Sequence, residues 1–263
     1  MQICVVAEPW RAHPLAWIHR AEARSIAAEL RRADHEIRLT QYRPGMSFPP
    51  GTPLLRLSDP VMVRAARALS DEGLPYIGPA ANVLERCYDK LEASRLASDH
   101  GIDCPATDGP QFLLKPRRGS DSLGIRVLRR RPSSIPDGYL LQEYVRGFDV
   151  TVGVVRGRVG MPLRVMLPEG QPYSFLRKYL LRPRHEVLAD ERARQLAGRI
   201  ARLFEAEWAV RVDFILERDS GRLKFLECDA APLIGARSAF AASLAAGGCS
   251  RREQLALLLA VGA

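Results

Sequence analysis

The chain has 263 residues, of which 47% are hydrophobic, and carries a formal net charge of +9. This length and composition allow a sizeable core, arranged as one large domain or two to three small ones. The charge raises the question of nucleic-acid binding, but the arginines are spread along the sequence and only Arg129–Arg131 forms a run. No basic helix with interleaved aromatic residues and no zinc-finger spacing accompanies that run, which argues against a nucleic-acid partner.

Cysteines and apolar runs restrict the cellular setting. The five cysteines are scattered without a CxxC pair, so neither a disulfide framework nor a zinc site is indicated. The apolar stretch 3–7 is too short for the h-region of a signal peptide. No apolar run approaches the roughly 20 residues of a membrane-spanning helix. We therefore expect a cytoplasmic protein that has no membrane partner.

In chain order, the first third alternates expected strands with expected helices. Helical spacing of apolar residues predicts helices over 14–32 and 60–69. Strands are expected at 2–7, 35–40 and 54–57, with a short fourth strand at 75–78. Strands that alternate with helices favour a parallel sheet. Residues 1–84 are therefore predicted to form a small parallel α/β domain.

The remaining chain is predicted to form two α+β subdomains, 85–145 and 146–263. The central one contains a helix over 90–100, a strand over 112–116 that carries Lys115, and an antiparallel sheet. A Gly- and Ser-rich loop, 119–124, follows that strand. The last subdomain contains strands and two helices, expected at about 188–204 and 251–259.

The most informative segment reads as a β-hairpin with a charged face. Residues 211–217 and 222–229 are strand-like and flank the turn residues Asp-Ser-Gly. Side chains two residues apart share a face, so Arg211 and Asp213 would meet Glu227 and Asp229 across the hairpin. Clustered carboxylates favour a hard cation such as Mg²⁺. The alternative is a surface hairpin whose exposed face is merely charged.

Further motifs occur in a fixed order along the chain. They are Asp89-Lys90 with the helix ending at Gly101-Ile-Asp-Cys-Pro105, the strand Phe112–Pro116, the loop Gly119–Gly124, the segment Leu140–Gly153, and Lys178-Tyr179. With the hairpin, these motifs resemble the ATP-grasp superfamily, and within it the D-alanine–D-alanine ligase branch. The resemblance covers about residues 89–248. It implies the ATP-grasp fold, an α/β and α+β architecture in which two subdomains clamp ATP.

The resemblance also implies roles for individual residues. Arg211, Lys178 and Ser122 would be catalytic, and Arg211 and Ser238 would contact substrate. Asp213, Glu227 and Asp229 would hold two Mg²⁺ ions, with Mn²⁺ as a possible replacement. The implied ATP-binding residues are Lys90, Lys115, Gly119, Ser120, Ser122, Gly124, Gln142, Glu143, Val145, Asp149 and Lys178.

Some of these residues have simpler interpretations. Asp149 could be an ordinary hairpin residue, and Ser238 could simply cap the following helix. His13 and His19 are either surface histidines or contacts for an acidic or aromatic substrate. The only lysines in the chain are Lys90, Lys115, Lys178 and Lys224, and three of the four stand at phosphate-contacting positions of the resembled family.

The chain departs from the ligase pattern at the substrate end. Asp229 stands where the family usually has Asn, and Leu233 stands where it has a glycine whose N–H helps to bind an oxyanion. The family's N-terminal Gly-Gly-Ser-Glu segment is replaced by Ala7-Glu8-Pro-Trp10-Arg11-Ala-His13. The residues that the resemblance implies for ATP binding keep the family pattern. D-alanine is therefore doubtful as the substrate.

The resulting expectation is an ATP-dependent, ADP-forming carboxylate–amine ligase that acts on a small amino acid or peptide through an acyl phosphate. Two alternatives stay open. One is intramolecular cyclisation of a single substrate by the same chemistry, and the other is a non-catalytic ATP-binding protein. Because relatives of this fold are commonly dimers, a homodimer is also compatible with the resemblance.

Overall fold

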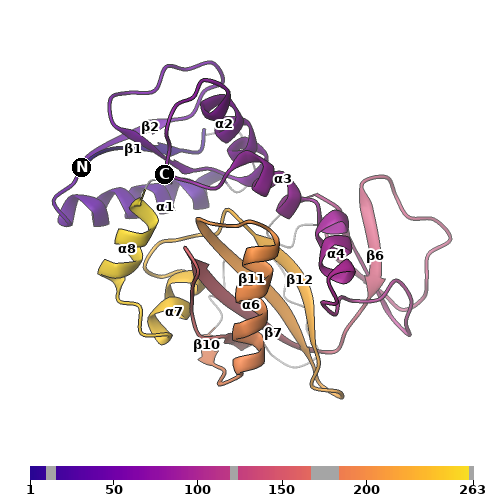
Figure 1. Ribbon diagram of the computed structural model, residues 1–263. Helices are drawn as coiled ribbons and strands as arrows, with labels where there is room; N and C mark the ends of the chain where they lie inside the picture. Colours follow the sequence, from indigo (N-terminus) through magenta and orange to yellow (C-terminus); the bar gives the residue numbers. More distant parts are fainter. Residues whose placement is uncertain (10–15, 119–123, 167–183, 261–263) are drawn as a thin grey trace.

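The computed structural model describes residues 1–9, 16–118, 124–166 and 184–260 (Figure 1). The N-terminal part contains a three-stranded parallel sheet in the order β2-β1-β3. Its central strand β1 is apolar and buried, with helices α1 and α2 against the sheet. The bounds are β1 (Gln2–Ala7), α1 (Ala16–Arg32), β2 (Glu36–Gln41), β3 (Thr52–Arg56) and α2 (Asp59–Asp71).

The parallel sheet agrees with the expectation from the sequence, with one difference. The expected fourth strand at 75–78 is reduced to a single parallel bridge between Leu54 and Ile77. Both faces of the sheet are buried, because Ile3 and Val5 belong to one core cluster and Cys4 and Val6 to another. Burial on both faces is the usual environment of a parallel sheet.

The central part consists of two short helices and a three-stranded antiparallel sheet in the order β5-β4-β6. Asp89 separates the helices and caps the second one, since its Oδ1 accepts hydrogen bonds from the N–H groups of Leu91 and Glu92. The bounds are α3 (Ala81–Tyr88), α4 (Lys90–Asp99), β4 (Phe112–Pro116), β5 (Arg126–Leu128) and β6 (Tyr139–Glu143).

The C-terminal part contains a larger sheet in the order β10-β9-β7-β11-β12, with β8 paired to β7. Helix α6 packs against β7 and β11 on one side, and α7 packs against β7 (Figure 1). The bounds are β7 (Gly147–Val155), β8 (Arg158–Val159), β9 (Leu163–Met166), β10 (Arg184–Val187), α6 (Glu191–Leu203), β11 (Ala209–Glu217), β12 (Leu223–Asp229), α7 (Ala239–Ala246) and α8 (Arg251–Leu259).

One glycine sets the distance between α7 and the large sheet. A Cβ atom on Gly160 would lie 2.5 Å from the Ser243 backbone, so only glycine allows this approach. The Ser243 hydroxyl accepts a hydrogen bond from the Gly153 N–H at 2.9 Å and donates one to the Met161 carbonyl at 2.6 Å. These bonds fix the helix that begins directly after Ser238.

Each of the three sheets lies within one of the three segments expected from the sequence, and the exact division at residues 84 and 145 remains a prediction. None of the helices in the described ranges is both long enough and apolar enough to cross a bilayer.

Candidate active site

Strands β11 and β12 form the expected antiparallel hairpin. Its register places Arg211 opposite Asp229 and Asp213 opposite Glu227. Cys228, between the two acids of β12, turns to the opposite face and is 1% exposed. Strand alternation thus places one guanidinium and three carboxylates on a single face of the sheet.

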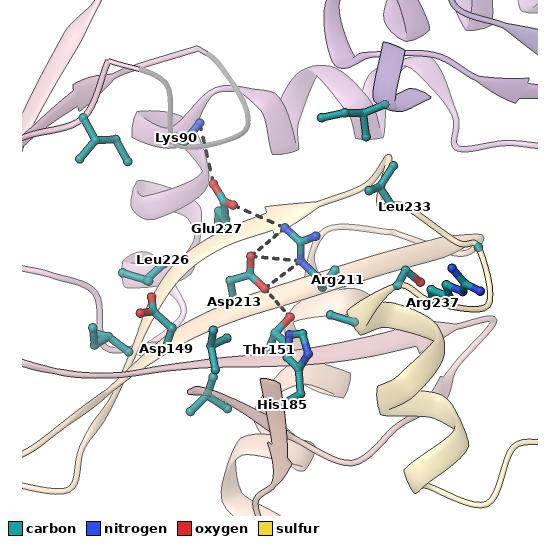
Figure 2. A pocket seen from close by; sticks show the side chains of 18 of the residues that line it. Lys90, Asp149, Thr151, His185, Arg211, Asp213, Leu226, Glu227, Leu233 and Arg237 are labelled. Carbon is teal, nitrogen blue, oxygen red and sulfur yellow. Dashed lines mark hydrogen bonds and ion pairs between the residues drawn. The ribbon is translucent and has the colours of Figure 1, made fainter. Parts of the chain in front are cut away.

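The Arg211 guanidinium lies among these carboxylates (Figure 2). Its Nη2 atom is 2.9 Å from Asp213 Oδ2, 3.1 Å from Asp229 Oδ2 and 3.8 Å from Glu227 Oε1. Burial would lower the pKa of Arg211, but the charges of Asp213, Asp229 and Glu227 outweigh it and raise that pKa well above its usual value. The guanidinium therefore remains a permanent cation at the centre of the face.

Two lysines from the central part approach the same face. Lys90, the first residue of α4, places its Nζ 3.9 Å from Glu227 Oε2. Lys115 in β4 is 5% exposed, and no hydrogen bond or ion pair to it is found within the described ranges. Burial lowers the pKa of Lys115 to about 8, with the positive charge of Lys90 adding to this and Glu227 opposing it. A buried lysine that forms no direct ion pair with any described residue is suited to an anionic ligand.

Asp149 in β7 adds a fourth carboxylate near the hairpin (Figure 2). Burial, together with the negative charges of Asp213 and Glu227, raises the pKa of Asp149 to about 7. Next to it on the same face, the Thr151 hydroxyl donates a hydrogen bond of 2.6 Å to Asp213 Oδ1. The region therefore carries more negative charge than Arg211 alone neutralises.

Except for Asp229, all these groups border one cavity of about 1180 Å³. Gln142, Glu143, Val145 and Asp149 line one end, Lys90, Lys115 and Arg211 the middle, and α1 together with the segment 233–239 the other end. A single drug-sized ligand usually occupies a pocket of about 300–1,000 Å³. This cavity is large enough for a nucleotide and a second small molecule.

At the first end, the side chains of β6 differ in their partners. Glu143 accepts hydrogen bonds from the Lys224 ammonium and from the Ala106 N–H, the latter at 2.9 Å. Burial tends to raise the pKa of Glu143, but these partners lower it. Gln142 is 6% exposed, and its Oε1 atom has no hydrogen-bond partner among the described residues. Gln142 therefore offers a free acceptor to a ligand, whereas the Glu143 carboxylate is already engaged.

Comparison with known proteins gives a consistent picture. The D-alanine–D-alanine ligase of Maridesulfovibrio salexigens is 25% identical over 226 residues, which cover 74% of each chain. The D-alanine–D-alanine ligase of Bacillus anthracis complexed with ATP aligns with a TM-score of 0.80 at 17% identity, over 98% of this chain and 96% of that one. The VanG D-Ala:D-Ser ligase of Enterococcus faecalis aligns with a TM-score of 0.77 at 16% identity, over 98% of both chains. The chain is therefore similar to D-alanine–D-alanine ligases and has the ATP-grasp fold.

The relationship to the ligases is distant. No protein-family model matches the sequence. The chain spans only 41% and 64% of the lengths of two further D-alanine–D-alanine ligases, from a Synechococcus strain and from Aquifex aeolicus. The identity of its substrates therefore depends on its own residues rather than on those of the relatives.

Most of the site residues expected from the sequence line this cavity. Gly119, Ser120, Ser122 and Lys178 lie outside the described residues, as does His13. Ser238 lines the cavity, but its side chain accepts a hydrogen bond from the Ala241 N–H and caps α7. His19 is buried rather than a surface histidine.

The metal ligands expected from the sequence are present on one face but not in a metal-binding arrangement. Among the described residues, no three His, Cys, Asp or Glu side chains are grouped so as to hold a metal ion. The reason is the position of Arg211, which contacts both Asp213 and Asp229. A metal role for these acids remains a prediction.

Sequence reasoning missed four residues at or beside the site. Glu22 lies on the buried stripe of α1 with Ile18 and Ile26, and a carboxylate at this spacing signals a buried partner. Arg56 ends the apolar run of β3. Thr151 shares the face of Asp149 by simple alternation. No local sequence pattern indicated a role for Lys224, because its partner Glu143 is 81 positions away.

Proposed function

We propose that this chain is an ATP-dependent carboxylate–amine ligase that phosphorylates a carboxylate, joins it to an amine and releases ADP and phosphate. One observation carries the proposal. The hairpin places Arg211 among Asp213, Glu227 and Asp229, and Arg211, Asp213 and Glu227 line a cavity that Lys90 also lines. The likeness to D-alanine–D-alanine ligases supports the same reaction class.

The nucleotide would occupy the end of the cavity near β6. Gln142, Glu143 and Val145 would surround adenine, with the Glu143 side chain held away by Lys224, and Asp149 would accept the ribose hydroxyls. Lys90 and Lys115 would contact the α- and β-phosphates as compact cations. The loop 119–124 and Lys178 would contact the β- and γ-phosphates, in line with the family resemblance.

The donor set fits a hard divalent cation. Asp213, Glu227 and Asp229 offer the carboxylate oxygens that Mg²⁺ prefers. Burial and the nearby negative charges of Asp213 and Glu227 together raise the pKa of Asp149, and a cation would neutralise those charges. When bound, Mg²⁺ would neutralise charge on the phosphates during transfer. The residues that would hold it are Asp213, Glu227 and Asp229, with Arg211 released toward the substrate.

The reaction then proceeds in two steps. A carboxylate oxygen of the first substrate attacks the γ-phosphorus, the bond to the ADP oxygen breaks, and an acyl phosphate forms. The nitrogen of the amine substrate attacks the acyl carbon, phosphate leaves, and the ammonium nitrogen loses its proton. Arg211 would stabilise the acyl phosphate and the later oxyanion, because its positive charge is permanent.

The test is ADP release with Mg²⁺ and ATP against a panel of D- and L-amino acids and dipeptides, followed by mass spectrometry. A ligase gives substrate-dependent ADP and a product one water lighter than the two substrates together. ADP release with a single substrate that loses one water would replace ligation by cyclisation. Tight ATP binding without ADP release across the panel would indicate a non-catalytic ATP-binding protein.

A variant separates the chemistry from the fold. Glu227→Gln keeps the size of the side chain, and because Glu227 is about one-third exposed the fold should be retained. Turnover should fall by at least a hundredfold if Glu227 holds the metal. Full activity in Glu227→Gln would disprove the metal assignment.

Two further parts of the proposal concern the setting. All five cysteines are free thiols, which together with the use of ATP favours the cytoplasm. A homodimer is proposed from the family resemblance, and light scattering of the purified protein would test it.

A further inference from the structure

The cavity continues beyond Arg211 to an end that the nucleotide would not fill. Figure 2 shows Asp149 on one side, Asp213 and Glu227 next to Arg211, and Leu233 and Arg237 on the far side of Arg211. This far end is lined by α1 and by the segment 233–239. A molecule that reacts at Arg211 therefore has room to extend toward Arg237.

The acidic side chains at this end are already paired. Glu22 forms an ion pair of 2.5 Å with Arg56, and Glu29 forms one of 2.6 Å with Arg251. Among the described residues that line the far end, Glu22 and Glu29 are the only acids. Their negative charges are therefore cancelled locally.

Two arginines at this end have no such partner. Arg32 and Arg237 both line the cavity, both are exposed, and neither forms a hydrogen bond or ion pair with any described residue. The two lie on facing elements, because Glu29, one turn before Arg32, accepts a hydrogen bond of 3.4 Å from the Ala236 N–H. The far end of the cavity thus carries a surplus of positive charge.

We propose that the amine substrate carries a second carboxylate, in addition to its α-carboxylate, and that Arg237 and Arg32 bind it. The substrate class is an acidic amino acid or a short peptide with an acidic residue. A guanidinium matches a carboxylate in a two-pronged geometry, which makes it the preferred side chain for this recognition. The inference rests on the proposed function, since it assumes that the amine substrate enters at this end.

Binding of matched amino-acid pairs tests the proposal without requiring turnover. Glutamate is compared with glutamine and aspartate with asparagine, each as D- and L-forms and as the C-terminal residue of an alanyl dipeptide. Calorimetry is performed on the full chain with Mg²⁺ and a non-hydrolysable ATP analogue. At least one acid should bind about tenfold tighter than its amide, the order expected for one charged hydrogen-bonded contact.

Variants connect this preference to the two arginines. Arg237→Gln should reduce the preference for the acid to about twofold or less, and Arg32→Gln should reduce it partly, while affinity for the ATP analogue stays unchanged. Arg252→Gln is the matched control. It removes the same charge from an exposed position of α8, but Arg252 does not line the cavity.

The outcomes separate this inference from the proposed function. Equal binding of acids and amides, no binding of any acid, or a preference that survives in the Arg32→Gln, Arg237→Gln double variant would overturn it. ADP release with a neutral amine and no preference for acids would support the ligase and overturn the inference. Acid binding that depends on Arg237 but occurs without ADP release would support the acid site and contradict the ligase.

Discussion

Arg56 of β3 and Glu22 of α1 form a buried ion pair that also holds the loop after β12. Arg56 is 0% exposed, and its Nη2 atom lies 2.5 Å from Glu22 Oε2 and 2.7 Å from the Pro232 carbonyl oxygen. Glu22 Oε1 accepts hydrogen bonds from the N–H groups of Ile234 and Gly235. The backbone is therefore fixed on both sides of Leu233, the residue that replaces a family glycine.

This relationship predicts a defect in stability and in substrate binding for Glu22→Gln. Removing one charge of a buried pair leaves the other uncompensated, which costs about 3–5 kcal/mol. In urea unfolding, the free energy of unfolding should fall by at least about 2 kcal/mol. This fall is smaller than the full cost, because the Gln side chain still accepts some of the hydrogen bonds. In steady-state kinetics, KM for the amino-acid or peptide substrate should rise more than KM for ATP.

The exposed pair between Arg67 and Glu85 supplies the control. Arg67 is 59% exposed, so Arg67→Gln should change the unfolding free energy by no more than about 0.5 kcal/mol. Equal effects of the two variants, or unchanged stability in Glu22→Gln, would show that the buried pair does not hold the loop.

Local patterns were sufficient for much of the fold. The alternation in β11 and β12 predicted the hairpin and its register, because the period of a strand fixes which side chains share a face. Helix α8 lies at its predicted residues, since Ser250 and Glu253 form a capping box at its start. The parallel N-terminal sheet followed from strands that alternate with helices.

Tertiary contacts determine side-chain partners that the sequence alone could not predict. The Ser238 side chain was expected to contact substrate or to cap a helix, and the structure shows the cap. Glu143 was expected at adenine, but Lys224 from another sheet binds its carboxylate. Such partners are far away in the sequence, so periodicity carries no information about them.

Because Lys115 is buried with a lowered pKa, we expect that a substitution at this position in the binding site stabilises the protein. Its pKa is about 8 in the folded state and 10.5 in the unfolded state, so the unfolded chain holds more protons between these values. Stability therefore rises with pH from about 8 to 10.5, and the charged lysine costs about 3 kcal/mol below pH 8. Lys115→Met should be more stable than the wild type at pH 7, and this difference should vanish near pH 10.5.

Lys224→Met is the matched control for Lys115→Met. Both lysines are 5% exposed, but Lys224 is paired with Glu143. Removing Lys224 leaves a half-buried carboxylate without its cation, so this variant should be less stable at pH 7. Opposite signs in urea unfolding are expected for the two variants. A destabilised Lys115→Met at pH 7 would contradict the cost assigned to the charged lysine.

Asp149 predicts that binding of the Mg²⁺–nucleotide complex releases protons. With a pKa of about 7, this carboxyl is about half protonated at neutral pH. A bound cation favours the ionised form, so about half a proton should be released at pH 7, and affinity should rise between pH 6 and 8. Calorimetry in two buffers of different ionisation enthalpy measures the release.

Two controls identify the source of these protons. Asp149→Asn cannot ionise at this position and should show little release. Removal of Mg²⁺ with EDTA should also abolish the release, because the nucleotide alone brings only negative charge. A release that persists in Asp149→Asn would assign the protons to another group.

Gln142 predicts selection of adenine over guanine. Its free Oε1 atom can accept a hydrogen bond from the adenine amino group, whereas guanine presents a carbonyl oxygen at the equivalent position. Gln142→Met keeps the volume but removes the acceptor, so the preference for ATP over GTP should fall by about tenfold or more. Because an unpaired buried oxygen acceptor is also removed, the unfolding free energy should rise by about 1 kcal/mol. Gln254→Met is the matched control, since Gln254 is 1% exposed but donates to the Ala241 and Cys249 carbonyls. That variant should lose stability and keep the nucleotide preference, and an unchanged preference in Gln142→Met would remove Gln142 from base recognition.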